Sequence, residues 1–290
     1  MIRARRLLVA AIAVVVATHA SAASRNFIWK VSGRQGAIYL VGSVHMLTKD
    51  YYPLNPALDK AFKDSDLLVE EADLGEMLAP TSQLALLQTG MLPSDQSLDK
   101  VLSQSTYEQV SKRMNDLGLP IEPLRQFKPW ALAIMLLGLE WQKAGFDPNL
   151  GLDKHFYDRA QNEGKAVQGL ETLAYQLSRF DGMTMAQQDR LLADTIKGLD
   201  TEMGNVNKLA DAWKAGDAPT VERIVLAELK DDPVMYQRLL VERNQNWLPK
   251  LEALLSRSGR AFVVVGAAHL VGPDGLLSVL KAKGYAVEQL

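Results

Sequence analysis

The chain has 290 residues, of which 32 are basic and 34 acidic, and it contains no cysteine. The lack of cysteine excludes disulfides and thiolate chemistry, so any metal site must be built from histidines and carboxylates. A slightly acidic chain without a basic block is a poor candidate for binding nucleic acid or an anionic membrane.

The first 22 residues have the three parts of a bacterial secretory signal. Arginines come first, then the apolar run LLVAAIAVVVA, then the small residues Ala20-Ser21-Ala22. We therefore expect export to the periplasm or the medium, with cleavage after Ala22 and one mature domain over residues 23–290. An uncleaved N-terminal anchor is the alternative. No later stretch reaches about 18 apolar residues, so we expect no membrane span in the mature chain.

The N-terminal part of the mature chain shows strand signals around one helix. FIWKVS and AIYLVGS flank Gly33–Gly36 and predict a β-hairpin with a glycine-containing turn. Asn55-Pro56 predicts the start of a helix that keeps its apolar spacing to about residue 64. LLVEEAD, residues 67–73, predicts a short buried strand with acidic residues at its end.

Helical patterns dominate the middle of the chain. Between residues 75 and 145, Ser105 and Glu108 predict a capping box, and Pro129 predicts the start of an apolar helix. Residues 152–164 predict a helix that ends at a glycine, and KAVQGLE after it predicts a second short strand.

The rest of the chain is again mostly helical before it ends in strands. Residues 172–258 are mostly helical, with breaks expected near Gly198, Gly216 and residues 231–233. Strand AFVVVGA, a helix ending at Gly284 and strand YAVEQL close the chain. Strands at both ends and in two interior islands predict an α/β fold. Its mixed sheet is built from distant segments and carries a mainly helical insertion.

One phrase occurs twice: an apolar run, a glycine, two small or apolar residues and a histidine. The copies are Gly42-Ser43-Val44-His45 and Gly266-Ala267-Ala268-His269. Ligands of α/β sheets bind where the strands end. If the two strands are adjacent, we expect the ring nitrogens of His45 and His269 to lie roughly 3–5 Å apart. This spacing suits a shared Zn²⁺, Mn²⁺, Fe or Co ion. The alternative is two ordinary strand exits whose histidines cap or pack.

Acidic candidates stand at the ends of the two interior strands. Alternation in VEEAD puts Glu71 and Asp73 on one face and Glu70 on the other. Glu171 ends the next strand. Acids at such positions are costly unless they are exposed, paired or metal-bound. Each of them also fits a helix cap or a solvated charge.

Two further polar residues lie on predicted helices. Arg243 lies among core-like residues and is suited to pair with one of the acids or to hold a substrate carboxylate. Its alternative is a surface ion pair. His155 is expected to have a structural role.

Together these stretches resemble the TraB/PrgY/GumN family over nearly all of the mature chain, in the expected order. The matching stretches are YLVGSVHML, LLVEEAD, FKPWAL, GLDKHF, GKAVQGLETL, LLVERNQNW and VVVGAAHLVGPDGLLSVLKAKGY. The resemblance implies an active site formed by the paired motifs and an acidic residue, here Gly42 and His45, Glu71, and Gly266 and His269. The Tiki proteins of animals, which are similar to this family, are metalloproteases that need Mn²⁺ or Co²⁺. Other similar folds are associated with haem or iron.

We therefore expect an exported metal-dependent hydrolase of the peptidase type, acting on a peptide or a small molecule. His45, His269 and Glu71 would hold one divalent ion of Mn, Co, Zn or Fe. The alternative is a non-catalytic protein of the cell envelope that binds haem, a metal or a small signal. Whether the chain forms a homodimer is left open.

Three other residues complete the predicted chemistry. Glu171 or Asp73 would be the general base, and Arg243 would orient the substrate or stabilise the oxyanion.

Overall fold

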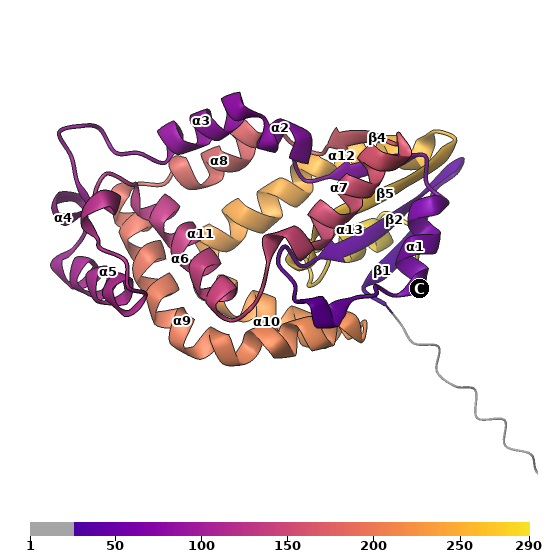
Figure 1. The fold of residues 1–290 in the computed structure, drawn as a ribbon. Coiled ribbons are helices and arrows are strands. Elements are labelled where there is room, and N and C mark those ends of the chain that lie inside the picture. The colour runs from indigo at the N-terminus through magenta and orange to yellow at the C-terminus, as the bar shows by residue number, and fades with distance from the viewer. Residues whose placement is uncertain (1–25) are drawn as a thin grey trace, which may run out of the picture.

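The computed structural model describes residues 26–290, without the side chains at positions 200–205, 228, 230 and 231. The predicted leader, residues 1–22, lies outside the described residues. The chain forms a six-stranded mixed sheet with helices around it and to one side (Figure 1). The predicted α/β class is therefore confirmed.

The sheet combines strands from both ends of the chain with two interior strands, in the order β4-β3-β5-β2-β1-β6. The strands are β1 (Ile28–Ser32), β2 (Gly36–Ser43), β3 (Leu67–Glu70), β4 (Ala166–Gly169), β5 (Gly259–Gly266) and β6 (Ala286–Gln289). β1 pairs antiparallel with β2, as the hairpin signal predicts, and also with β6. β4, β3, β5 and β2 run parallel and therefore end at the same edge.

Thirteen α-helices lie within the described residues. They are α1 (Pro56–Lys63), α2 (Leu74–Leu78), α3 (Pro80–Thr89), α4 (Leu98–Val101), α5 (Gln104–Asp116), α6 (Pro129–Lys143), α7 (Leu152–Glu163), α8 (Leu173–Asp181), α9 (Met185–Lys214), α10 (Ala218–Asp231), α11 (Pro233–Tyr236), α12 (Glu242–Ser256) and α13 (Leu276–Ala282). Most of the predicted start and stop signals are used. Asn55 caps α1, and Gly164 ends α7 in the left-handed conformation.

Two local predictions in the helical part are wrong. The cap of α5 is Ser103, whose hydroxyl accepts from the Thr106 N–H, so the helix starts before the predicted capping box at Ser105. The expected break at Gly198 is absent because α9 continues through it. A single glycine costs a helix only about 1 kcal/mol, which the packing of a long helix offsets.

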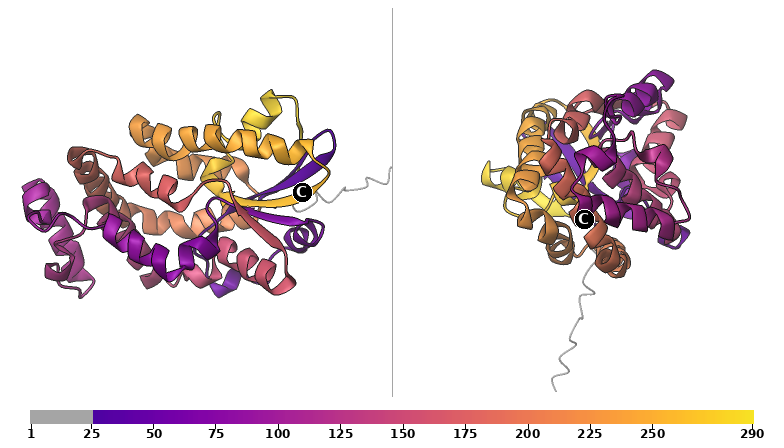
Figure 2. Two further views of the ribbon diagram at one scale, coloured as in Figure 1. Left: turned by 90° about the horizontal axis from the view of Figure 1, so that it is seen from above. Right: turned by 90° about the vertical axis from the view of Figure 1, so that its left-hand side faces the viewer.

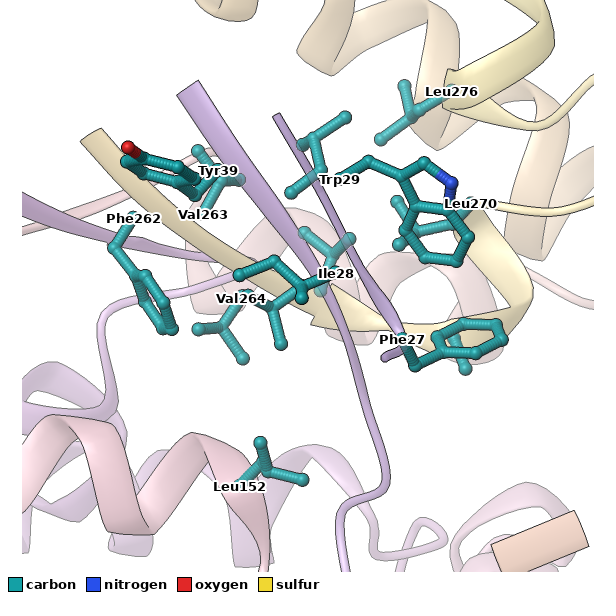
Figure 3. Close-up of a cluster of buried hydrophobic side chains, with 14 of the residues drawn as sticks. Phe27, Ile28, Trp29, Tyr39, Leu152, Phe262, Val263, Val264, Leu270 and Leu276 are labelled. Atoms are coloured by element: carbon teal, nitrogen blue, oxygen red, sulfur yellow. The ribbon is translucent and has the colours of Figure 1, made fainter. Parts of the chain in front are cut away.

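Helices cover both faces of the sheet. α1 and α7 lie on one face, and α12 and α13 lie on the other (Figure 2). The rings of Phe62, Phe156 and Phe262 join α1, α7 and β5, with centroids 4.5–5.3 Å apart. Figure 3 shows the apolar side chains that fill the core around the strands, including Ile28 and Val264. The strand ends are thus fixed by packing on both faces.

Helices α4, α5 and α6 and the first part of α9 form a second apolar cluster, separate from the core around the sheet. The buried side chains of Leu132 and Leu136 from α6 belong to the same apolar cluster as Leu192 and Ile196 from α9. No helix within residues 26–290 combines the length and the low charge that crossing a bilayer requires.

Candidate functional site

The site lies where the parallel strands end. β2 and β5 are neighbours, with Ser43 opposite Gly266, which confirms that the two GxxH strands lie side by side and point the same way. β3 flanks β5, with Glu70 opposite Val264, and β4 flanks β3, with Glu70 opposite Gly169. The residues that leave the sheet at this edge are His45, Glu71, Glu171 and His269.

Three of the predicted side chains converge on Gly266. A methyl group at this position would lie 3.2 Å from Glu71 Oε1, 3.4 Å from His45 Nε2 and 3.7 Å from His269 Cδ2. The Gly266 N–H also donates a hydrogen bond of 2.7 Å to Glu71 Oε1. The glycine of the second motif therefore leaves room for a carboxylate between two imidazoles.

The glycine of the first motif serves packing. A methyl group at Gly42 would lie 2.3 Å from the ring of Phe27. The Gly42 carbonyl accepts a hydrogen bond of 2.7 Å from Trp213 Nε1. The two motif glycines are thus needed for different reasons, one structural and one within the site.

Arg243 lies at the centre of the buried part of the site. Its Nη2 donates to Glu71 Oε2 and, over 2.7 Å, to Glu171 Oε1. Its Nη1 contacts His269 Nε2 at 3.0 Å. The Arg243 side chain is 9% exposed and that of Glu171 is fully buried. The alternative of a surface ion pair is therefore wrong, and the arginine pairs with both predicted acids.

The local helix geometry presents this arginine. A π-helical turn, Gln237–Val241, comes directly before α12, and Arg243 Nη1 donates to the carbonyl of Leu239 over 3.4 Å. π-turns interrupt the regular rotation of a helix and are frequent at functional sites. Here the extra residue of the π-turn changes the angle around the helix axis at which α12 begins, and Arg243 then faces the sheet edge.

Hydrogen bonds define the orientation of His269. Asn244 Nδ2 donates to the carbonyls of His269 and Asp274, so Asn244 Oδ1 accepts from His269 Nδ1 over 2.8 Å. The lone pair of His269 is therefore on Nε2, where it accepts from Arg243. Burial lowers the pKa of His269 to about 3, which keeps the ring neutral.

His45 lies on the open side of the site. Its side chain is 63% exposed, and its Nδ1 contacts Asp153 Oδ2 at 2.8 Å. The charge of Asp153 raises the pKa of His45 to about 9. The two motif histidines therefore differ at neutral pH, since one is buried and neutral and the other is exposed and protonated.

The buried carboxylates also differ. Burial alone would raise the pKa of Glu71, but Arg243 and the two histidines hold the pKa below its ordinary range. Burial raises the pKa of Glu171, although Arg243 and the N–H of Trp247 oppose this change. Glu71 is therefore the charged partner of Arg243, and Glu171 is the more enclosed of the two acids.

Asp73 and Glu70 lie beside this network. β3 ends at Glu70, so the alternation predicted to run through Asp73 stops before it. Asp73 caps α2, where its Oδ1 accepts from the N–H groups of Gly75 and Glu76. Glu70 is buried, one of its carboxylate oxygens has no hydrogen-bond partner among the described residues, and burial raises its pKa to about 8. A base role for Asp73 stays a prediction.

The comparison with known proteins fits this arrangement. A family model described as the TraB/PrgY/gumN family matches residues 27–289. The chain belongs to this family. The match spans all six strands and both GxxH motifs, so it covers every residue of the candidate site.

The TraB/PrgY/gumN member described here has distant relatives in bacteria and animals. It is 26% identical to the uncharacterized protein YbaP of Escherichia coli (strain K12), over 84% of this chain and 87% of that protein. It is 24% identical to the metalloprotease TIKI2 of Xenopus tropicalis, over 91% of this chain and 59% of that protein, and 22% identical to the metalloprotease TIKI1 of the same species. No solved structure matches.

The donor types in this TraB/PrgY/gumN site fit a divalent ion. Two imidazoles and a carboxylate surround Gly266, and each imidazole is anchored through Nδ1, as metal-binding histidines usually are. One donor is engaged, because His269 Nε2 accepts from Arg243. Within residues 26–290 no group of three or more His, Asp or Glu side chains is arranged as a metal site. Binding therefore requires Arg243 to release His269 and His45 Nε2 to lose its proton.

Two residues in this network were missed by sequence reasoning as site residues. Asp153 holds His45, and Gln176 Nε2 donates to Glu71 Oε2 over 3.1 Å. Asn244, which holds His269, is polar and next to Arg243 in the sequence, which favours a place in the site. Asp153 lies in GLDKHF, one of the family stretches, where the nearby histidine is the more obvious candidate for a functional residue. That histidine, His155, packs against the rings of Tyr52 and Phe156, which agrees with its expected structural role.

Proposed function

We propose that the chain is an exported metal-dependent hydrolase that cleaves peptide bonds. The observation that carries the proposal is the convergence of both GxxH imidazoles and Glu71 on Gly266, next to a buried arginine. The metalloproteases among the relatives support the reaction class, and the chain spans about 60% of their length. The arginine-rich and apolar start of the sequence supports export.

In this proposal His45, His269 and Glu71 hold one divalent ion of Mn, Co, Zn or Fe. When bound, such an ion supplies Lewis-acid polarisation of the carbonyl to be cleaved.

The remaining residues act around that position. Arg243, once it turns away from His269, offers N–H groups to the oxygen on which negative charge develops. Glu171 supplies the negative charge that pairs with the guanidinium, since both its oxygens accept from Arg243 and one also accepts from Trp247. Of the two predicted bases, Asp73 has the free oxygen, because its Oδ2 makes no hydrogen bond within the described residues, whereas both oxygens of Glu171 are engaged.

The test is digestion of a peptide library by metal-stripped protein to which Mn²⁺, Co²⁺, Zn²⁺ or Fe²⁺ is added back singly. We expect cleavage with at least one of these ions, and at least about a hundredfold loss in His45→Ala, His269→Ala and Glu71→Gln. The matched control is His155→Phe, which keeps an aromatic ring in the packed position of the histidine outside the site.

Three results would contradict the proposal. One is cleavage that survives complete removal of metal. Another is unchanged cleavage in both His45→Ala and His269→Ala. The third is the absence of cleavage with every ion, and a Soret band in the purified protein would then favour the alternative of a haem-binding protein of the cell envelope.

A further inference from the structure

Asp153 lies at the start of α7, beside the exposed histidine of the site. α7 begins at Leu152 and has Gly151 as its N-cap. A methyl group at Gly151 would lie 2.0 Å from the carbonyl oxygen of His45, and the Leu152 N–H donates to the carbonyl of Val44 over 3.2 Å. The first turn of α7 therefore packs directly on the backbone that carries His45, and this contact fixes the place of the Asp153 carboxylate.

One oxygen of that carboxylate accepts from two donors. Asp153 Oδ2 accepts hydrogen bonds from Ser43 Oγ and, over 2.8 Å, from His45 Nδ1. The donors are the last residue of β2 and the histidine of the first motif. The His45 side chain is 63% exposed and the Asp153 side chain 21%. Because an exposed imidazole is otherwise free to rotate, this contact selects one orientation of the ring.

The selected orientation directs the other ring nitrogen into the site. With Nδ1 toward Asp153, His45 Nε2 lies 3.4 Å from the position that a Gly266 methyl group would take. Asn244 Oδ1 anchors the second motif histidine, His269, in the same way. The exposed ring is held by a charged carboxylate and the buried ring by a neutral amide, as expected from the cost of burying a charge.

We propose that Asp153 is a positioning residue that holds His45 with its Nε2 toward Gly266 and Glu71. The inference rests on the proposed function at one point, namely that His45 Nε2 binds the metal ion. A carboxylate behind a metal-binding histidine fixes the ring and increases its basicity, and its loss typically weakens metal binding by about 10–100-fold.

The first measurement is calorimetric titration of the metal-stripped full chain with Co²⁺. We expect Asp153→Ala, which leaves no acceptor for His45 Nδ1, to bind Co²⁺ about 10–100-fold more weakly than the wild type and still to unfold cooperatively in a thermal melt. The matched control is Asp158→Ala on the same helix, which removes the ion pair of Asp158 with Lys154. Ser43→Ala removes the second donor to the same oxygen and leaves the His45 contact, so we expect it to bind Co²⁺ nearly as the wild type does.

The second measurement needs no metal. In ¹⁵N-labelled protein at low temperature, the hydrogen-bonded Nδ1–H of His45 gives a resonance that is assigned by its absence from His45→Ala. We expect this resonance in the wild type, in Ser43→Ala and in Asp158→Ala, and its loss or a large shift in Asp153→Ala. If Asp153→Ala does not fold, Asp153→Leu, whose side chain has the branched shape of aspartate and likewise accepts no hydrogen bond, carries the same expectation.

An unchanged His45 resonance together with Co²⁺ affinity within about twofold of the wild type in Asp153→Ala would overturn the proposal. Equal losses in Ser43→Ala and Asp153→Ala would also overturn it, because the carboxylate would then act through Ser43 at the end of β2 and not through His45. A wild type that takes up none of Mn²⁺, Co²⁺, Zn²⁺ and Fe²⁺ refutes the proposed function, and the resonance of His45 still decides the role of Asp153.

Discussion

Arg243 holds the buried half of the site together by charge. It is hydrogen-bonded to Glu71, Glu171 and His269, and both carboxylates are buried with it. Removing one partner of a buried ion pair leaves an uncompensated charge in a medium of low dielectric constant. Lysine does not replace arginine here, since only the planar guanidinium donates to several acceptors at fixed angles.

We therefore predict that Arg243→Met lowers the free energy of unfolding by about 3–5 kcal/mol, and that Arg243→Lys does not restore it. Urea denaturation followed by circular dichroism measures the change. The control is Lys283→Ala, which breaks an exposed pair with Glu252 and is expected to change stability little. An Arg243→Lys protein that unfolds at the urea concentration of the wild type would refute the account of the buried cluster.

His155 gives a pH-dependent prediction that does not involve the site. Burial, with the nearby charge of Arg159, lowers the pKa of His155 below its ordinary value of 6.5. The folded state therefore binds fewer protons than the unfolded state just below that pH, and the stability from the neutral ring is lost as the pH falls.

We predict that His155→Phe becomes more stable relative to the wild type as the pH falls from 7 to about 5. Urea midpoints of the two proteins at several pH values give the comparison. A stability difference that does not change with pH would show that His155 titrates alike in both states.

The strand exits show how a repeated sequence phrase can meet two different needs. Both GxxH motifs follow parallel neighbouring strands. The glycine of the first accommodates the ring of Phe27, and the glycine of the second accommodates Glu71 and His45. The same substitution in the two motifs should therefore have two different results.

Gly42→Ala places a methyl group 2.3 Å from the Phe27 ring, and we predict a loss of about 1–3 kcal/mol in stability from overpacking. Gly266→Ala meets its neighbours at 3.2–3.4 Å and should reduce activity about tenfold or more at a smaller cost in stability. Thermal melts and peptide cleavage rates of the two variants separate these effects. Equal stability losses with equal activity would show that the glycines are interchangeable.

Much of the fold could be predicted because its signals are local. The hairpin, the helix start at Asn55-Pro56 and the helix end at Gly164 each depend on neighbouring residues. Signals of this kind fail where a competing residue lies two positions away, as at Ser103, or where packing outweighs propensity, as at Gly198.

The candidate site was only partly predictable for the same reason. The end of a strand marks His45, Glu71, Glu171 and His269, since their positions follow from the sheet. The partner of His45 lies 108 residues away on α7, and no local pattern joins the two residues. The π-turn before Arg243 and the cap formed by Asp73 likewise depend on geometry that spacing alone does not give.

The site is assembled only when the two ends of the chain meet. β2 comes from the start of the described chain and β5 from its end, and the mainly helical segments between them are inserted into the sheet. Each GxxH copy brings one imidazole to the same place from its own strand. The doubled phrase is thus explained by convergence on Gly266.

Export is a prediction about the full-length chain. We predict that expression in a bacterial host yields a processed protein that begins at Ala23 and is recovered from the periplasm or the medium. Mass spectrometry of the intact protein measures the N-terminus. Recovery of a chain that still carries residues 1–22 would support the uncleaved anchor instead.

The most direct test of the account is the number of Co²⁺ ions that the metal-stripped protein binds. We predict one ion per chain in the wild type and in His155→Phe, and no uptake in His45→Ala or in His269→Ala, because each motif supplies one imidazole to a single ion. One ion bound with wild-type affinity by both His45→Ala and His269→Ala would contradict the joint site.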